Sequence, residues 1–202
     1  MVWGGFMPGI FRSAWGSPKI KILFLGDSIT AGYGVAQEES YPALLGQKLE
    51  SFGIHHVEII NGSISGSTTA SALSRLKWFR KASPDVLVLA LGANDGLRGL
   101  SVENMEENLG RAISFAKNSN MDVILAGMQI PPNYGPEYAD DFKQVFTTLA
   151  DLHGVVLIPF LLDGVGGRAN MNQPDGIHPN REGHQQIAKT VFPFILKQIE
   201  EP

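Results

Sequence analysis

The chain has 202 residues, of which 44% are hydrophobic and 18% are charged, and its formal net charge is −4 at pH 7. This length and composition are typical of one globular domain with an ordinary core, while the acidic balance argues against nucleic-acid binding as the main activity. The sequence contains no cysteine, which excludes disulfides, a thiolate nucleophile and Cys-ligated metal sites.

The first 17 residues are rich in glycine and aromatic residues and contain no apolar run long enough for a signal sequence or a membrane span. We interpret residues 1–17 as an N-terminal extension, either the remnant of a leader or an arm that packs on the surface. The folded domain is then expected to span residues 18–202.

Beyond residue 18 the chain alternates short apolar runs with longer segments of helical period. The apolar runs show little polar alternation, as expected of parallel strands that are covered on both faces. Five strands are predicted, at residues 20–25, 57–60, 86–91, 123–126 and 155–158. Helices are predicted at about 41–52, 69–81, 102–118, 138–152 and 181–199.

This alternation predicts the fold class, because parallel neighbours joined by helices require right-handed crossovers. We expect an α/β fold of three layers: a doubly wound, flavodoxin-like, five-stranded parallel sheet in the order 2-1-3-4-5, with helices on both faces. In such sheets ligands bind at the carboxyl ends of the strands.

Glycine and polar residues gather where the predicted strands end. The segments that directly follow the first three strands are 26–28 (Gly-Asp-Ser), 62–66 (Gly-Ser-Ile-Ser-Gly) and 92–95 (Gly-Ala-Asn-Asp). A fourth segment, 175–179, opens the last helix and places Asp175 three residues before His178. A carboxylate at this spacing can orient the imidazole through its Nδ1 proton. We expect all four segments to meet at one edge of the sheet.

These four blocks, in this order, resemble the SGNH (GDSL-type) hydrolase family over residues 20–185. Within that family the chain is most similar to the multifunctional bacterial acyl-CoA thioesterase/arylesterase/lysophospholipase group. The narrower resemblance is carried by residues 94–99, 128–135 and 175–180.

The resemblance implies a serine hydrolase of acyl esters and thioesters that needs no cofactor. It implies Ser28 as nucleophile, His178 as base and Asp175 as the residue that orients the base. It also implies an oxyanion hole formed by the N–H groups of Ser28 and Gly66 and the side-chain amide of Asn94. The chemistry agrees, since a serine hydroxyl needs an adjacent base and the developing oxyanion needs fixed donors.

The substrate groove is less well defined by the sequence. The apolar segment that ends at Pro132, together with Tyr134, is either core plus turn or the lining of an acyl groove. The candidate substrate-binding residues are Leu97, Ile130, Pro132 and Tyr134. No metal site is predicted, because no His-Glu-x-x-His pattern or carboxylate cluster with ligand spacing occurs.

Each block has a plainer interpretation when it is taken alone. Gly, Asp and Ser are common turn and cap residues, and Asp27 in particular is expected to act as a helix cap or loop organiser. A nucleotide-binding protein is disfavoured by the missing phosphate loop, and an α/β-hydrolase by the missing Gly-x-Ser-x-Gly elbow. A carbohydrate O-deacetylase of the same broad family, and a binding module that kept the fold without its chemistry, are the remaining alternatives.

The expected partner is a small-molecule acyl ester or thioester, with no nucleic acid and no membrane span, and the protein is expected to be a monomer. The resemblance implies a periplasmic or secreted location, although the composition itself fits the cytoplasm equally well.

Overall fold

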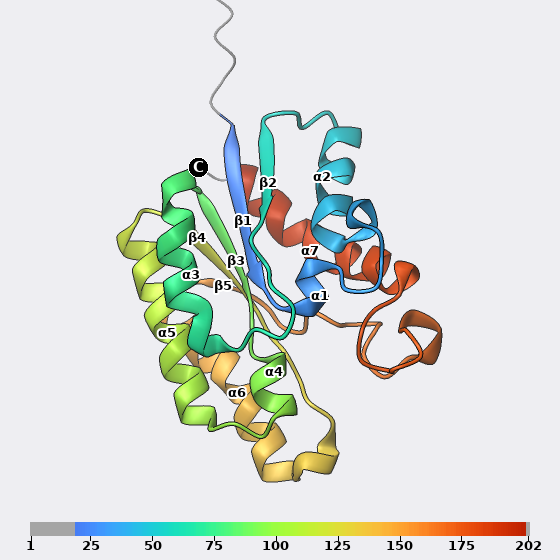
Figure 1. Ribbon diagram of the computed structural model, residues 1–202. Coiled ribbons are helices and arrows are strands. Elements are labelled where there is room, and N and C mark those ends of the chain that lie inside the picture. Colours follow the sequence, from blue (N-terminus) through green and yellow to red (C-terminus); the bar gives the residue numbers. More distant parts are fainter. Residues whose placement is uncertain (1–18, 201–202) are drawn as a thin grey trace, which may run out of the picture.

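The computed structural model describes residues 19–200, apart from the side chain of Pro132, so the predicted extension at residues 1–17 lies outside the described residues. Five parallel strands form one sheet in the order β2-β1-β3-β4-β5 (Figure 1). The predicted strand order is confirmed. The strands are β1 (Ile20–Gly26), β2 (Val57–Asn61), β3 (Val86–Ala90), β4 (Asp122–Ala126) and β5 (Val156–Ile158).

Helices cover both faces of the sheet, which confirms the predicted three layers. Helices α2 and α7 pack together on one face, while α3, α5 and α6 lie on the other (Figure 1). The helices are α1 (Ser28–Ala31), α2 (Tyr41–Ser51), α3 (Ala72–Phe79), α4 (Ala93–Leu97), α5 (Val102–Asn118), α6 (Pro136–His153) and α7 (Arg181–Glu200). Short 3-10 turns are η1 (Gln37–Glu39), η2 (Thr69–Ser71), η3 (Arg80–Ala82), η4 (Pro132–Tyr134) and η5 (Ala169–Met171).

The central strands owe their position to their composition. Every residue of β3 is buried, as are the last five residues of β1, because both strands are continuous apolar runs covered on both faces. Helix α5 begins where the Ser101 hydroxyl accepts the N–H of Asn104 at 3.1 Å, and α6 ends at Gly154 in the left-handed conformation. These caps set where α5 begins and where α6 ends.

Two short helices are absent from the sequence predictions, whereas the last helix is found where it is predicted. Helices α1 and α4 are only four and five residues long, too short to produce a helical period. Helix α7 continues through Pro193, because the buried Val191 and Ile195 on either side keep packing on the core. Within residues 19–200, no helix combines the length and the hydropathy that crossing a membrane requires.

Candidate active site

Ser28 lies at the carboxyl end of the first strand, where the chain turns sharply into a helix. Strand β1 ends at Gly26, whose missing Cβ leaves room for Thr30, since an added Cβ would lie 2.3 Å from the Thr30 hydroxyl oxygen. Asp27 is the N-cap of α1, and Ser28 is the first helical residue. The Ser28 N–H therefore belongs to the first turn, whose N–H groups have no acceptor within the helix.

The second part of the site is the loop that precedes α7. Asp175 Oδ1 accepts the backbone N–H groups of Ile177 at 2.9 Å and His178 at 3.0 Å, while Oδ2 lies 2.7 Å from His178 Nδ1. The two backbone N–H groups, with the imidazole, lower the pKa of Asp175 to about 2. Asp175 is thus an ionised carboxylate within hydrogen-bond distance of the ring.

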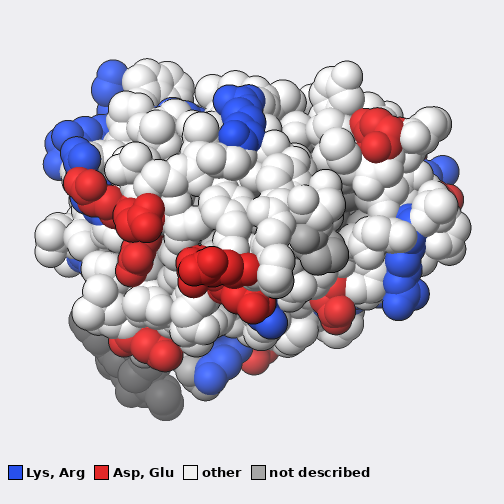
Figure 2. Space-filling view, turned by 90° about the horizontal axis from the view of Figure 1, so that it is seen from below, with Lys and Arg blue, Asp and Glu red and all other residues white. Residues whose placement is uncertain are grey.

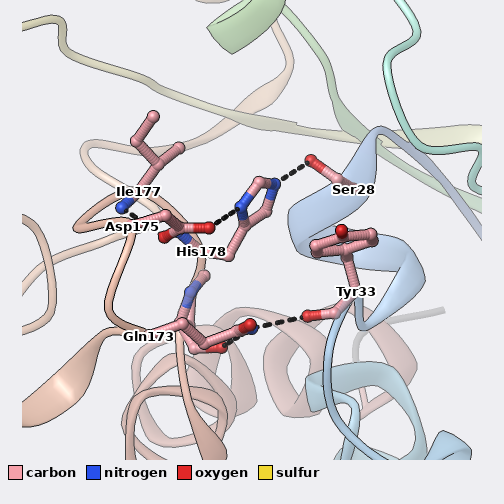
Figure 3. A network of polar contacts seen from close by, with 7 residues as sticks. Ser28, Tyr33, Gln173, Asp175, Ile177 and His178 are labelled. Carbon is pink, nitrogen blue, oxygen red and sulfur yellow. Dashed lines mark hydrogen bonds and ion pairs between the residues drawn. The ribbon is translucent and has the colours of Figure 1, made fainter.

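These two parts meet at a hydrogen bond between side chains that are 150 residues apart in the chain. His178 Nε2 lies 3.0 Å from Ser28 Oγ (Figure 3). The hydroxyl, the imidazole and the carboxylate therefore form one continuous relay. Such a relay can take a proton from the serine and hold the resulting imidazolium in place.

Two residues that the sequence analysis did not single out hold this relay together. Gln173 Nε2 donates to the carbonyls of Tyr33 at 2.7 Å and Pro179 at 3.0 Å, and the Tyr33 ring lies 4.7 Å from the His178 ring (Figure 3). Gly34 makes room for this amide, since a Cβ there would lie 2.2 Å from Gln173 Oε1. No local pattern marks Gln173, because its partner Tyr33 lies 140 residues away in the chain.

The two other predicted oxyanion-hole residues lie on the loops after β2 and β3. Gly66 is exposed and has φ +78°, a conformation that glycine adopts without strain, and its carbonyl accepts from Arg98 at 3.0 Å. Asn94 is the second residue of α4, and one of its two amide hydrogens goes to the Ser67 carbonyl at 3.1 Å. Asn94 thus bonds to the Gly66 loop and keeps a second amide hydrogen to donate.

Asp27 is a second carboxylate next to the serine, and it is buried. Oδ1 accepts the Ile29 N–H at 3.1 Å, as expected of a cap, whereas Oδ2 is buried and has no hydrogen-bond partner among the described residues. Burial raises the pKa of Asp27 to about 6, against the opposing effects of the Ile29 N–H and His178. Arg75 lies in the same region and donates through Nη2 to the carbonyls of Gly26 and Gly62.

The candidate substrate-binding residues gather near α4. The Tyr134 hydroxyl donates to the Leu97 carbonyl at 2.9 Å, which ties η4 to the end of α4. Ile130 is buried against Gly96, where a Cβ would lie 2.4 Å from its side chain. The side chain of Pro132 lies outside the described part of the chain. Their contact with substrate stays a prediction.

Comparisons with known proteins identify the family of this chain. Residues 24–186 match the GDSL-like Lipase/Acylhydrolase family. An arylesterase of Vibrio mimicus is 39% identical over 93% of this chain and 94% of its own length. The thioesterase 1/protease 1/lysophospholipase L1 of Escherichia coli is 36% identical over 89% of this chain and 83% of its own length.

A solved structure gives the same result for the fold. The crystal structure of the psychrotrophic esterase EstA from Pseudoalteromonas sp., inhibited by monoethylphosphonate, superposes with a TM-score of 0.85. It is 34% identical and covers 91% of this chain and all of that one. The chain therefore belongs to the GDSL-like Lipase/Acylhydrolase family and is a serine ester hydrolase.

Proposed function

We propose that this enzyme hydrolyses acyl esters and acyl thioesters through an acyl-enzyme on Ser28, with His178 as base and Asp175 as its orienting carboxylate. The observation that carries the proposal is the relay from Asp175 to Ser28, with distances of 2.7 Å and 3.0 Å at its two hydrogen bonds. No cofactor takes part in the proposed reaction.

The reaction proceeds in two halves. Ser28 Oγ attacks the acyl carbonyl while His178 Nε2 takes the serine proton, and the imidazolium then gives that proton to the departing alcohol or thiol. Water, deprotonated by the same ring, attacks the acyl-enzyme and releases the acid. Asp175 keeps Nδ1 protonated and the ring aligned throughout.

The negative charge that forms on the carbonyl oxygen is stabilised by neutral donors. The proposed donors are the N–H groups of Ser28 and Gly66 and the second amide hydrogen of Asn94. Their supports favour this role: Ser28 N–H is in the first turn of α1, and Asn94 is held to the Gly66 loop through Ser67. Fixed donors of this kind stabilise a transition state without having to reorganise.

The names of the relatives guide the choice of substrates. One relative is an arylesterase and another a thioesterase and lysophospholipase, so we propose aryl esters, acyl-CoA thioesters and lysophospholipids as substrates here. Leu97, Ile130, Pro132 and Tyr134 are the proposed contacts of the acyl chain, and their apolar character suits it.

A substrate panel tests this proposal. We expect hydrolysis of a chain-length series of p-nitrophenyl esters and of acyl-CoAs, together with covalent labelling by a fluorophosphonate, which reacts readily only with an activated serine. Preference for an acetylated sugar by orders of magnitude would instead identify a carbohydrate O-deacetylase. Absence of both labelling and turnover would indicate a binding module.

We also propose that residues 18–202 form one hydrolase domain that acts as a monomer. The family match at residues 24–186 lies within these bounds. Light scattering behind a size-exclusion column tests the oligomeric state, and a mass of one chain, 21.9 kDa, is expected.

A further inference from the structure

An exposed apolar surface lies beside the loop that carries Gly66. Ile64 and Trp78 expose 56% and 62% of their surface, and the Trp78 ring meets Phe79 edge-on at 4.7 Å. Phe79 in turn packs on Gly62, where a Cβ would lie 2.5 Å from its ring. Ile64, Trp78 and Phe79 line a groove of about 530 Å³ between the end of β2 and α3.

The chain that builds this surface is basic, although the protein as a whole is acidic. Residues 59–84 contain no Asp or Glu, while the net charge of the whole chain is −4. The same segment contains Lys77, Arg80 and Lys81, all exposed. Lys81 follows Trp78 by three residues and so lies on the same side of the helix. We call the set of Ile64, Lys77, Trp78, Phe79, Arg80 and Lys81 the α3 ridge.

The neighbouring elements determine which cations of the α3 ridge have no acidic side chain beside them. Lys77 shares a groove with Glu103, Glu106 and Glu107 of α5, which offset its charge. Arg75 is committed to the carbonyls of Gly26 and Gly62. Glu58 precedes the acid-free segment on β2, and Asp85 follows it. Lys81 is therefore the cation on the same side as Trp78, and Arg80 precedes it on the turn η3, where Lys21 Nζ also donates to the Ala82 carbonyl at 2.8 Å.

An exposed tryptophan beside lysine and arginine is the combination that suits the surface of an anionic bilayer. The indole ring favours the headgroup region, and basic side chains are attracted to anionic lipids. We propose that the α3 ridge docks this enzyme on anionic phospholipid surfaces, from which amphiphilic esters reach Ser28. This role rests on the proposed function, since Ile64 lies two residues before Gly66 and so next to the proposed oxyanion hole.

Vesicle sedimentation tests the docking directly. We expect the wild-type protein to sediment with phosphatidylglycerol-containing vesicles, to bind pure phosphatidylcholine vesicles much less, and to be released by salt. Arg80→Glu combined with Lys81→Glu, and separately Trp78→Ser, should each weaken vesicle binding about tenfold or more. All three side chains are exposed, so thermal unfolding of these variants should stay close to that of the wild type.

Matched controls separate the ridge from general surface effects. Lys189→Glu with Lys197→Glu makes the same charge change on exposed positions of α7, and Leu152→Ser removes an apolar side chain on α6 that is 72% exposed. Both controls should bind vesicles like the wild type, and all variants should hydrolyse monomeric p-nitrophenyl acetate at the same rate.

Three results would overturn the docking proposal. They are failure of the wild type to bind anionic vesicles, equal binding to both kinds of vesicle, and equal losses in the controls and the ridge variants. Failure of the proposed function gives a different result, because p-nitrophenyl acetate itself would not be hydrolysed.

Discussion

Two carboxylates lie near Ser28: Asp175 is linked to it through His178, and Asp27 precedes it in the chain. Their surroundings shift their pKa values in opposite directions. Asp175 is partly exposed and accepts three hydrogen bonds, two from backbone N–H groups and one from His178, so its pKa falls to about 2. Asp27 is 1% exposed, one of its oxygens has no hydrogen-bond partner within residues 19–200, and burial raises its pKa to about 6. Hydrogen bonds therefore favour the charge of Asp175, and desolvation disfavours that of Asp27.

We propose from this difference that Asp175 assists His178 in the reaction, whereas Asp27 acts only as the cap of α1. Asp175 touches the imidazole and can act on the reaction through it. Asp27 directly precedes the serine and caps α1. Because Asp27 is buried, its charged form destabilises the fold. Substitutions at the serine, at the two carboxylates and at Asn94 test this division of roles.

The first prediction concerns Ser28, whose Oγ is the proposed nucleophile. Replacing Ser28 or His178 by Ala should lower kcat by on the order of 10⁶, because either change removes the nucleophile or its base. Steady-state hydrolysis of a p-nitrophenyl ester measures this. Retention of more than about a tenth of the activity in Ser28→Ala would exclude this serine as nucleophile.

Asp175→Asn should lower kcat by about 10⁴, because an amide no longer enforces the tautomer with Nδ1 protonated. The same substitution at Asp27 is the matched control, since Asn can still cap α1 through its side-chain oxygen. The kcat of Asp27→Asn should stay far above that of Asp175→Asn. Equal losses in both variants would mean that the two carboxylates share one role.

Asn94→Ala tests whether the side-chain amide of Asn94 stabilises the oxyanion. The loss of this amide should lower kcat by about 10² to 10³, or roughly 3 to 4 kcal/mol. KM should change little, because the donor acts on charge that appears only in the transition state. A rise in KM with unchanged kcat would instead make Asn94 a substrate-binding residue.

The smallest effect is a pH-dependent change in stability at Asp27. Since its folded pKa lies above its unfolded value, the protonated carboxyl stabilises the fold in acid, and this contribution is lost as pH rises from about 4 through about 6. Asp27→Asn should therefore be more stable than the wild type at pH 8 by roughly 1 to 3 kcal/mol, and similar to it below pH 4. Urea unfolding at both pH values checks this.

The effect of His184 on the pH dependence of stability is opposite to that of Asp27. The variant is therefore compared with the wild type at each pH. Burial lowers the pKa of His184 to about 4, so the unfolded chain takes up a proton first and stability falls as pH drops from about 6.5 to about 4. The wild-type pH profile contains both contributions, whereas the difference between Asp27→Asn and wild type contains only that of Asp27. A difference that is the same at pH 4 and pH 8 would contradict the raised pKa.

Local sequence patterns predict the sheet and the contact between Asp175 and His178. The apolar runs and helical periods predict the strands and the layers, because burial on both faces leaves a pattern within a few residues, and the strand order is expected from the flavodoxin-like fold that such an alternation favours. Asp175 and His178 are three residues apart, so their contact is local and could be predicted from spacing. The position of the Ser28, Gly66 and Asn94 blocks after strands predicts that they lie at one edge of the sheet, while their proposed roles come from the resemblance to the SGNH family.

The contacts that join distant segments became known only from the assembled fold. The Ser28–His178 hydrogen bond spans 150 residues, and Gln173 reaches Tyr33 across 140, so no local pattern could encode either geometry. The burial of Asp27 and the exposure of Trp78 were likewise undetermined, because a polar residue in a turn and an aromatic residue in a helix fit several environments equally well. Solvent access is a property of the assembled layers, and it sets both the pKa of Asp27 and the surface that Trp78 presents.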